Sequence, residues 1–424
     1  MRTSLSAGTR ERIAKRLGAA NLEFAAKFPG ESGTREPVHT VYGGAHLFRS
    51  GTARKLGDLA MRSLAENAPD PGAFADALGI DGALANQVYA RVTAKLRSEP
   101  VEDYRIDFED GYGYRTEAEE DRDAERTAVE VAEGLASGSL PPFLGIRIKA
   151  LTEELRDRAI GTLDIFLTTL AERTGAALPP NFVVTLPKVT VPEQVAALAD
   201  ALDALEQQLG IAPGSLGLQI MIETPQAVAR LSELAEAGRG RCRGADFGAY
   251  DFTAACGVTS AHQHMLHPAC DYARHAMQVA LSGTGIRLSD GGTNAMPVPP
   301  HVHSAWRLQY RHIRHSLMCG FYSGWDLHPA QLPVRYAAVY AFFLEGMEEA
   351  SERLRHFLEK AARATLMRSV FDDAATGQGL LNFFLRAAGC GALGEAEAEA
   401  LAGLTIAELR SGSFTQILNG RRDQ

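Results

Sequence analysis

The sequence has no long apolar run and no excess of positive charge. No apolar run approaches the roughly 20 residues that a helix needs to span a bilayer. The first residues also lack an apolar core of the signal-peptide kind, so export is not expected. The formal net charge is −9, whereas nucleic-acid-binding surfaces are usually basic. The chain is therefore predicted to act without a membrane or nucleic-acid partner.

Cysteine is scarce as well. The chain has five cysteines, an odd number, and no CxxC spacing, which argues against a disulfide framework and against a zinc site built from paired cysteines. Reduced, buried thiols in a cytoplasmic protein are the better interpretation. Hydrophobic residues make up 46% of the chain and charged residues 22%. These fractions are ordinary for a globular protein and fit an enzyme that acts on small molecules.

Several nucleotide and hydrolase motifs are also missing. The Gly-rich pieces at Gly43 and Gly291 lack the GxGxxG spacing of a dinucleotide site, and there is no Walker A motif. No GxSxG elbow occurs, which argues against an α/β-hydrolase.

What the chain does contain is eight short apolar runs, most of them separated by stretches long enough for a helix. The runs are centred near Val41, Ile106, Ile146, Val184, Ile220, Phe247, Ile286 and Tyr322. This alternation predicts an α/β fold with a parallel sheet, and eight repeats are the number that closes a (β/α)8 TIM barrel. We expect the barrel over residues 37–335, between an N-terminal helical segment (1–36) and a C-terminal helical extension (336–424).

The N-terminal segment is basic and amphipathic. This pattern fits a helix that docks on another surface. A transit peptide is the alternative, but Glu11 and Glu23 interrupt the basic pattern.

Charged residues stand at or just beyond the ends of most runs, where a TIM barrel carries its active site. They are Glu109, Asp110, Arg147, Lys188, Glu223, Asp251, Asp290 and His328. Glu223 and Asp251 follow neighbouring runs, whose strands would lie ~4.8 Å apart. Their carboxylates could therefore share a hard divalent cation such as Mg²⁺ or Mn²⁺. The alternative is that each caps a helix or pairs with an arginine.

Arg147, Glu109 and Asp110 are candidate catalytic residues. Arg147 lies in an apolar run, where a guanidinium needs a partner. It either pairs with Asp107 or Glu109 or clamps a substrate carboxylate, and the two roles are compatible. Glu109 and Asp110 could hold metal-bound water or orient the arginine. Asp107 is expected to lie one residue too deep and to face the helical layer.

Lys188 and the histidines leave alternatives open. Lys188 is a Schiff-base lysine, a cation near the substrate, or a partner of Glu223. His262, His264 and His267 resemble a zinc site only superficially, because their spacing is not that of HExxH. We interpret them, and the histidines beyond residue 300, as loop or interface residues.

Six short motifs carry a family resemblance. They are Asp107–Asp110 (DFED), Gly145–Lys149 (GIRIK), Leu186–Val189 (LPKV), Ile222–Pro225 (IETP), Phe247–Phe252 (FGAYDF) and Trp325–Gln331 (WDLHPAQ). In this order, over residues 37–334, they resemble the citrate lyase beta-subunit-like aldolases, a branch of the pyruvate/phosphoenolpyruvate TIM barrels. The chain departs from that pattern at Lys149, where asparagine is usual, and at Tyr42–Gly44, where VPG is usual. It resembles a longer branch of the family.

The resemblance implies a Mg²⁺-dependent lyase or aldolase. Such an enzyme breaks or forms a carbon–carbon bond next to a pyruvate- or oxaloacetate-like keto acid, through an enolate that the metal and Arg147 stabilise. The implied metal ligands are Glu223 and Asp251, the catalytic residues are Arg147, Glu109 and Asp110, and the substrate-binding residues are Arg147, Lys188, Thr224, Pro225 and His328.

Two other functions remain open. A thioester lyase of the malyl-CoA or citramalyl-CoA type would use the same metal and also bind coenzyme A, although the long insertions at 111–115 and 262–269 weigh against it. A non-catalytic ligand-binding barrel is the other alternative, and a salt bridge between Glu223 and Lys188 would support it.

The C-terminal extension carries more apolar residues than a tail needs. They include Phe342, Phe343, Leu380, Leu381, Phe383, Phe384, Leu401, Leu404, Leu409, Phe414 and Leu418. In similar enzymes the C-terminal helices pack on a neighbouring subunit, so the resemblance predicts a homo-oligomer, a trimer or hexamer. The alternative is that these helices cover their own barrel.

Overall fold

The centre of the protein is a parallel β-barrel. The computed structural model describes residues 3–30, 33–367, 374–411 and residue 417, and these form a sheet of eight strands. The strands are β1 (Thr40–Gly44), β2 (Asp103–Asp107), β3 (Phe143–Arg147), β4 (Val183–Leu186), β5 (Gly217–Ile222), β6 (Cys242–Phe247), β7 (Arg287–Ser289) and β8 (Trp325–Asp326). Their spatial order follows the chain, with β8 beside β1. An isolated parallel bridge between Gly292 and Trp325 closes the ring. The predicted α/β TIM barrel is confirmed.

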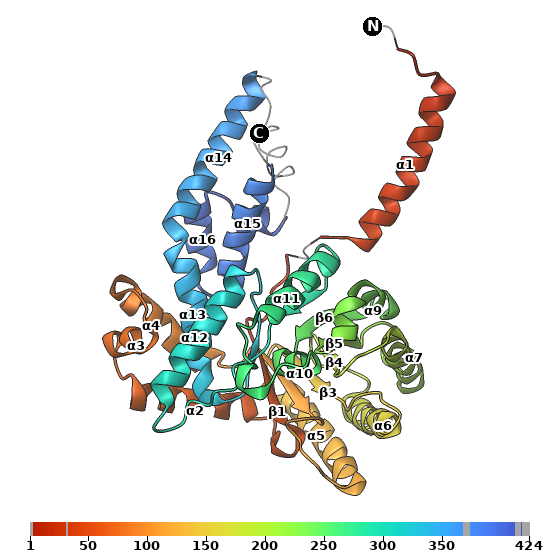
Figure 1. The fold of residues 1–424 in the computed structure, drawn as a ribbon, viewed down its shortest axis with the longest axis vertical. Coiled ribbons are helices and arrows are strands. Elements are labelled where there is room, and N and C mark those ends of the chain that lie inside the picture. Colours follow the sequence, from red (N-terminus) through yellow and green to blue (C-terminus); the bar gives the residue numbers. More distant parts are fainter. Residues whose placement is uncertain (1–2, 31–32, 368–373, 412–416, 418–424) are drawn as a thin grey trace.

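Helices alternate with the strands and surround the barrel (Figure 1). They are α2 (Thr52–Asn67), α3 (Pro71–Leu78), α4 (Gly82–Ser98), α5 (Glu117–Ser137), α6 (Arg156–Thr174), α7 (Pro192–Leu209), α8 (Pro225–Ala229), α9 (Leu231–Ala237), α10 (Ala249–Ala255), α11 (Pro268–Leu281) and α12 (Val302–Met318). Short 3-10 turns occur at η1 (Ala45–Leu47), η2 (Ser260–His262) and η3 (Pro329–Gln331). No described helix is both long and apolar enough to cross a membrane.

The eighth strand lies inside the predicted segment, GFYSGWDLHP, but is shorter and is not centred on Tyr322. β8 begins at Trp325, three residues after Tyr322. The ring of Tyr322 stacks on Phe343 of the following helix, with ring centroids 6.2 Å apart, and the Arg386 guanidinium lies 4.2 Å from its centroid. Tyr322 therefore packs between the barrel and the C-terminal helices instead of joining the sheet.

The middle of the barrel lumen is polar and fully buried. Arg105 from β2 donates from Nη1 to Asp103 at 2.5 Å and from Nε to Thr185 Oγ1 and Gln219 Oε1, both at 3.0 Å. The amide of Gln219 in turn donates to Asp246 Oδ1 at 2.5 Å. Because successive residues of a strand face opposite sides, residues two apart share the lumen face.

Asp246 links this lumen network to the first strand. Its Oδ2 accepts a hydrogen bond of 2.9 Å from the hydroxyl of Tyr42. Burial raises the pKa of Asp246, and the charge of Arg105 opposes that rise. The lumen therefore supplies each of its buried charges with a partner, as a buried charge requires.

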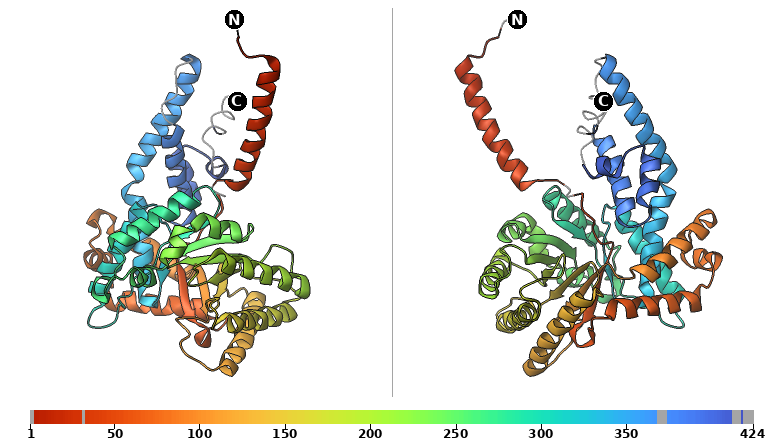
Figure 2. Two further views of the ribbon diagram at one scale, coloured as in Figure 1. Left: turned by 45° about the vertical axis from the view of Figure 1, so that its right-hand side comes forward. Right: turned by 180° about the vertical axis from the view of Figure 1, so that it is seen from behind.

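The C-terminal helices follow β8 on one side of the barrel (Figure 2). They are α13 (Leu332–Glu345), α14 (Met347–Met367), α15 (Ala374–Gly389), α16 (Glu395–Ala402) and α17 (Ile406–Arg410). The predicted boundary after residue 335 falls inside α13, most of whose residues are buried and which packs against α4 and α12. The division into three segments stays a prediction.

The apolar residues of this extension are covered by their own chain. Leu381, Phe384, Leu404 and Leu409 are buried, whereas Phe414 and Leu418 lie outside the described residues. The N-terminal helix α1 (Ala7–Lys27) behaves differently, because it has no buried residue and projects away from the barrel (Figure 2).

Candidate active site

Lys188 and Glu223 mark the carboxyl-terminal mouth of the barrel. Glu223 follows the last residue of β5, and its Oε1 accepts a hydrogen bond of 2.6 Å from the backbone N–H of Lys188, which lies just beyond β4. Lys188 has a φ of +50°, in the left-handed region that non-glycine residues rarely adopt. A residue held in such a conformation is typical of a functional site.

Glu223 and Asp251 form a pair of carboxylates. Burial, followed by the nearby charge of Asp251, raises the pKa of Glu223 to about 8. The strand prediction was wrong for Asp251: β6 ends at Phe247, and Asp251 lies in the first turn of α10. That short helix starts at once because Gly248 turns the chain, its N–H bonding the carbonyl of Ile222 at 3.0 Å. Neither carboxylate forms an ion pair with any described residue.

The lack of a side chain at Gly248 also leaves space for the side chain of Glu223. A Cβ at this position would lie 2.5 Å from both Cβ and Oε2 of Glu223. Any side chain at Gly248 would therefore displace the carboxylate.

The guanidinium of Arg147 is fixed by Asp107. Arg147 Nε and Nη2 donate to the two carboxylate oxygens of Asp107 at 2.7 and 2.5 Å, a bidentate pair. The expectation that Asp107 faces the helices was wrong, because Asp107 pairs with Arg147 in register across β2 and β3 and both point into the lumen. Nη1 of Arg147 lies 3.2 Å from Glu109 Oε2. The ring of Tyr42 lies beneath the guanidinium, 4.7 Å from centroid to Cζ.

Glu109 and Asp110 both pair with Lys188. The ammonium contacts Glu109 Oε1 and lies 3.0 Å from Asp110 Oδ1. Burial raises the pKa of Glu109. For Asp110 burial acts in the same direction, but Lys188 and Arg147 outweigh it and lower the pKa.

Lys188 stays charged in this setting. Burial disfavours its ammonium form, but Glu109 and Asp110 raise the pKa of Lys188 above its ordinary value. A Schiff-base lysine must instead be deprotonated. The structure therefore favours Lys188 as a cation near the substrate over the Schiff-base interpretation.

Thr224, Pro225 and His328 lie at the same end of the barrel. The Thr224 hydroxyl donates to the carbonyl of Val189 at 2.7 Å and accepts from the N–H of Ala227 at 3.1 Å, so it caps α8. Pro225 is the first residue of that helix. Nδ1 of His328 accepts from the N–H of Ala330 at 3.2 Å, and burial lowers the pKa of the His328 imidazole. Their predicted contacts with substrate stay predictions.

Three potential metal-binding side chains also meet between α11 and α12. Nε2 of His315 lies 2.7 Å from Asp271 Oδ1 and 3.7 Å from Cys319 Sγ. However, Arg274 Nη1 donates to the same Asp271 oxygen at 2.8 Å. Because a guanidinium already neutralises this carboxylate, we interpret the cluster as an ion pair that joins two helices.

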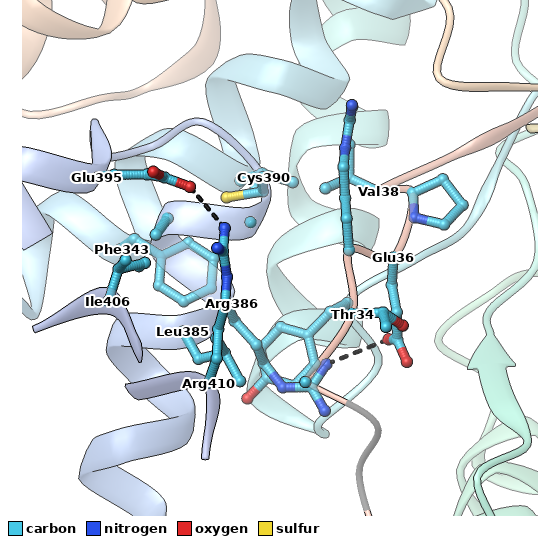
Figure 3. Close-up of a pocket in the computed structure, with 17 residues that line it drawn as sticks. Thr34, Glu36, Val38, Phe343, Leu385, Arg386, Cys390, Glu395, Ile406 and Arg410 are labelled. Carbon is cyan, nitrogen blue, oxygen red and sulfur yellow. Dashed lines mark hydrogen bonds and ion pairs between the residues drawn. The ribbon is translucent and has the colours of Figure 1, made fainter. Parts of the chain in front are cut away.

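A cavity of about 190 Å³ lies at the opposite end of the barrel (Figure 3). Its walls come from residues 33–38, which precede β1, and from helices α13, α15 and α17. Arg410 pairs there with Glu395, and Arg386 Nη1 lies 3.6 Å from Glu36. The amino-terminal end of a TIM barrel usually contributes to stability and not to chemistry. None of the candidate catalytic residues lines this cavity.

Two residues that support the site, Tyr42 and Gly248, were given no role from the sequence, whereas Asp107 was named there as a possible partner of Arg147. Tyr42 packs under Arg147, Asp107 holds it, and Gly248 clears space for Glu223. Strand alternation offered one signal, because Asp107 lies two residues from Arg105 and Glu109 on one face. No sequence signal pointed to Tyr42 or Gly248.

The fold matches known structures at low sequence identity. A citrate lyase from Burkholderia xenovorans LB400 is 18% identical with a TM-score of 0.57, over 87% of this chain and 96% of that one. The M. tuberculosis citrate lyase beta subunit, crystallised with oxaloacetate and magnesium, is 16% identical with a TM-score of 0.42, over 72% and 98% of the two chains. A Haloferax volcanii malate synthase, in a ternary complex with pyruvate and acetyl-CoA, is 16% identical with a TM-score of 0.49, over 71% and 69%.

The first of these matches confirms the predicted citrate lyase-like fold. No curated protein sequence matches the chain. One family matches residues 17–417, nearly the whole length, under the description "Domain of unknown function (DUF6986)". The chain belongs to the DUF6986 family.

Proposed function

We propose that this protein is a carbon–carbon lyase of the aldolase class that requires Mg²⁺ or Mn²⁺. Its substrate would contain a pyruvate- or oxaloacetate-like keto acid. The observation that carries the proposal is the carboxylate pair, because Glu223 and Asp251 repel each other beside a fixed guanidinium and a charged lysine.

The residues fit a divalent cation. Glu223 is 1% exposed and has a pKa of about 8, so its charged form is costly without a positive charge beside it. Two carboxylates with water and substrate oxygens in the remaining positions are a typical Mg²⁺ environment. A cation held by Glu223 and Asp251 would act as a Lewis acid on the substrate's oxygen atoms.

Arg147 supplies fixed positive charge at the mouth. Asp107 occupies its Nε and Nη2 edge, so a substrate oxygen would accept from Nη1, which in this structure lies 3.2 Å from Glu109 Oε2. A donor that is already oriented stabilises charge developing on an enolate without reorganisation. Lys188 adds a second cation that would attract the keto-acid carboxylate.

Glu109 is the group placed to move a proton. Bond cleavage leaves its electron pair on the keto-acid fragment as an enolate, while the hydroxyl proton of the other fragment must be accepted. Burial raises the pKa of Glu109, which suits a carboxylate that accepts this proton and later returns it to the enolate carbon.

A substrate screen tests this function. Aldol adducts of pyruvate and oxaloacetate are incubated with the protein, with and without Mg²⁺, and release of the keto acid is measured. We expect release by the wild type only with the metal, and none by Asp251→Asn. Metal-independent release, or equal release by Asp251→Asn, would contradict the proposal.

Two alternatives are separated from this one by simple observations. For a thioester lyase, a calorimetric titration would detect coenzyme A binding. A salt bridge between Glu223 and Lys188 would support a non-catalytic barrel, but the ammonium pairs with Glu109 and Asp110. A homo-oligomer and a cytoplasmic location remain predictions.

A further inference from the structure

Two neighbouring loops of the barrel mouth meet over the ring of Tyr112. His46 follows β1 and Arg115 follows β2, so both lie among the loops at the carboxyl ends of the strands, where a TIM barrel carries its active site. The centroids of the His46 and Tyr112 rings are 5.7 Å apart, and the Arg115 guanidinium lies 4.9 Å from the Tyr112 centroid. Tyr112 is buried, and its hydroxyl donates to Asp123 at 2.8 Å. One fixed ring therefore supports a histidine and an arginine at the rim of the mouth.

The loop that carries Arg115 begins beside Arg147. The N–H of Gly111 donates to Oδ2 of Asp107 at 2.7 Å, and this oxygen also accepts from Nη2 of Arg147. Arg115 follows Gly111 by four residues, a span that cannot exceed about 14 Å between Cα atoms. A substrate whose keto-acid end lies at Arg147 can therefore extend its other end to Arg115.

Arg115 is a cation without a partner in the part of the chain that the structure describes. Its Nε is buried and has no hydrogen-bond acceptor, and its guanidinium forms no ion pair there. Acidic residues follow in the first turn of α5, but they do not pair with it. Glu117 is exposed, and Glu119 accepts from the N–H and the hydroxyl of Thr116 at 2.9 and 2.7 Å. The positive charge of Arg115 is left for a ligand.

Two neighbouring cations, in contrast, are already paired. Lys149 lies 2.8 Å from Glu120, and Arg126 lies 2.8 Å from Asp123. An arginine that rests on an aromatic ring is oriented in advance, and its planar fork matches the oxygens of a carboxylate or a phosphate. Arg115 therefore has the geometry of an anion-binding residue.

His46 supplies a neutral donor next to this cation. Its Nδ1 is buried without a hydrogen-bond partner among the described residues. Burial, followed by the charge of Arg115, lowers the pKa of His46, so the imidazole is neutral near pH 7 and one ring nitrogen carries a hydrogen to donate. The ring fits here because residue 44 is glycine: a Cβ at Gly44 would lie 2.6 Å from Cε1 of His46. A neutral donor beside a guanidinium suits an anion and not a cation.

We propose that Arg115 and His46 bind an anionic group, a carboxylate or a phosphate, on the half of the substrate that is distant from the keto acid. The inference rests on the proposed function, which places the keto-acid end at Arg147 and Lys188. The distal anion would give Arg115 the counter-charge that the described residues do not, through charge-assisted hydrogen bonds. It would also accept from His46. The substrates are then aldol adducts with a negative charge at both ends.

Calorimetry with matched keto acids in the presence of Mg²⁺ tests the proposal. α-Ketoglutarate and α-ketoadipate carry a distal carboxylate, α-ketovalerate and α-ketocaproate are the same chains without it, and phosphonate analogues of the first two carry a distal phosphonate. We expect the wild type to bind at least one of the anionic ligands about 10-fold more tightly than its neutral counterpart. The tighter of the carboxylate and the phosphonate identifies the anion.

Three variants assign this preference to residues. Arg115→Met should abolish it and leave the affinity for α-ketovalerate unchanged. His46→Phe keeps a ring on Tyr112 but removes both nitrogens, and should reduce the preference by about 3-fold. The matched control is Arg122→Met, which removes a positive charge from an exposed position on the same helix that follows the loop and should keep the full preference. Melting temperatures check that each variant is folded.

Four results would overturn the proposal. Equal affinity of the wild type for anionic and neutral keto acids would remove the subsite and leave the proposed function standing. A full preference in both Arg115→Met and His46→Phe would remove the two residues from it, and if one variant does not fold the other decides. Coenzyme A that binds through Arg115, without any preference among the keto acids, would assign Arg115 to a thioester. Binding of none of the keto acids would contradict the proposed function, and the subsite with it.

Discussion

The middle of the barrel lumen and its carboxyl-terminal mouth both contain buried carboxylates, but these have different partners. In the lumen, Asp103 and Asp246 are matched by Arg105, Gln219 and Tyr42. At the mouth, Glu223 is buried and Asp251 is exposed, and neither has an ion-pair partner among the described residues. Polarity inside a barrel is therefore not by itself a sign of function. The sign is a buried carboxylate such as Glu223, which has no ion-pair partner among the described residues and whose pKa is raised to about 8.

The largest expected effect on stability comes from disrupting the lumen network around Arg105. Arg105→Met removes the two closest donors to buried Asp103 and leaves it with Arg287 at 3.7 Å, and we expect a loss of about 3–5 kcal/mol in the free energy of unfolding. Urea denaturation measures this. Metal binding by the folded fraction should stay normal, because Arg105 does not reach the mouth. A stability within 1 kcal/mol of wild type would show that the lumen network is not structural.

The next effect concerns Arg147, which pairs with Asp107 and lies between the lumen network and the mouth. Arg147→Lys cannot form the planar fork on Asp107 while donating to a substrate. Loss of one charge-assisted contact in the transition state should lower kcat/KM by about 100-fold. The matched control is Arg158→Lys, which pairs with Asp121 between outer helices and should leave kcat/KM unchanged. A lower melting temperature with normal kinetics would leave Arg147 only a structural role.

A smaller effect follows from filling the space beside Glu223. Gly248→Ala places a Cβ against that carboxylate, and we expect Mg²⁺ affinity to fall by roughly 10- to 100-fold, as for other supporting residues of metal sites. Gly82→Ala is the control, because a Cβ there meets nothing within 4 Å. Calorimetry that finds equal affinities for both variants would mean that Glu223 is not a ligand.

The smallest effect is a pH dependence of stability, caused by a histidine outside both the lumen and the mouth. Burial lowers the pKa of His312 from 6.5 to about 4. The neutral form is therefore favoured on folding, so this contribution to stability is complete above pH 6.5 and is lost as the pH falls toward 4. His312→Gln should flatten the fall in melting temperature over that window, whereas His303→Gln, at an exposed position, should not. Parallel profiles for wild type and His312→Gln would contradict this.

The sequence predicts which charged residues lie at the strand ends better than it predicts the contacts that position them. Repeated apolar runs specify the barrel, and Glu223, Asp251, Arg147 and Lys188 all lie at the expected end. The sequence names Asp107 and Glu109 as possible partners of Arg147, but the choice of Asp107 for the bidentate pair depends on the register between strands, which a single sequence does not display. The start of α10 before Asp251 depends on the turn at Gly248, and the shift of β8 depends on packing of Tyr322 against a distant helix.

The most direct test is a calorimetric titration of Mg²⁺ into the wild type, Glu223→Gln and Asp251→Asn. Neutral amides keep the shape of both side chains and remove the charge that holds the cation. The account predicts one Mg²⁺ per wild-type chain and no detectable binding by either variant, with melting temperatures at or above that of the wild type. Undiminished binding by either variant, or no binding by the wild type, would contradict it.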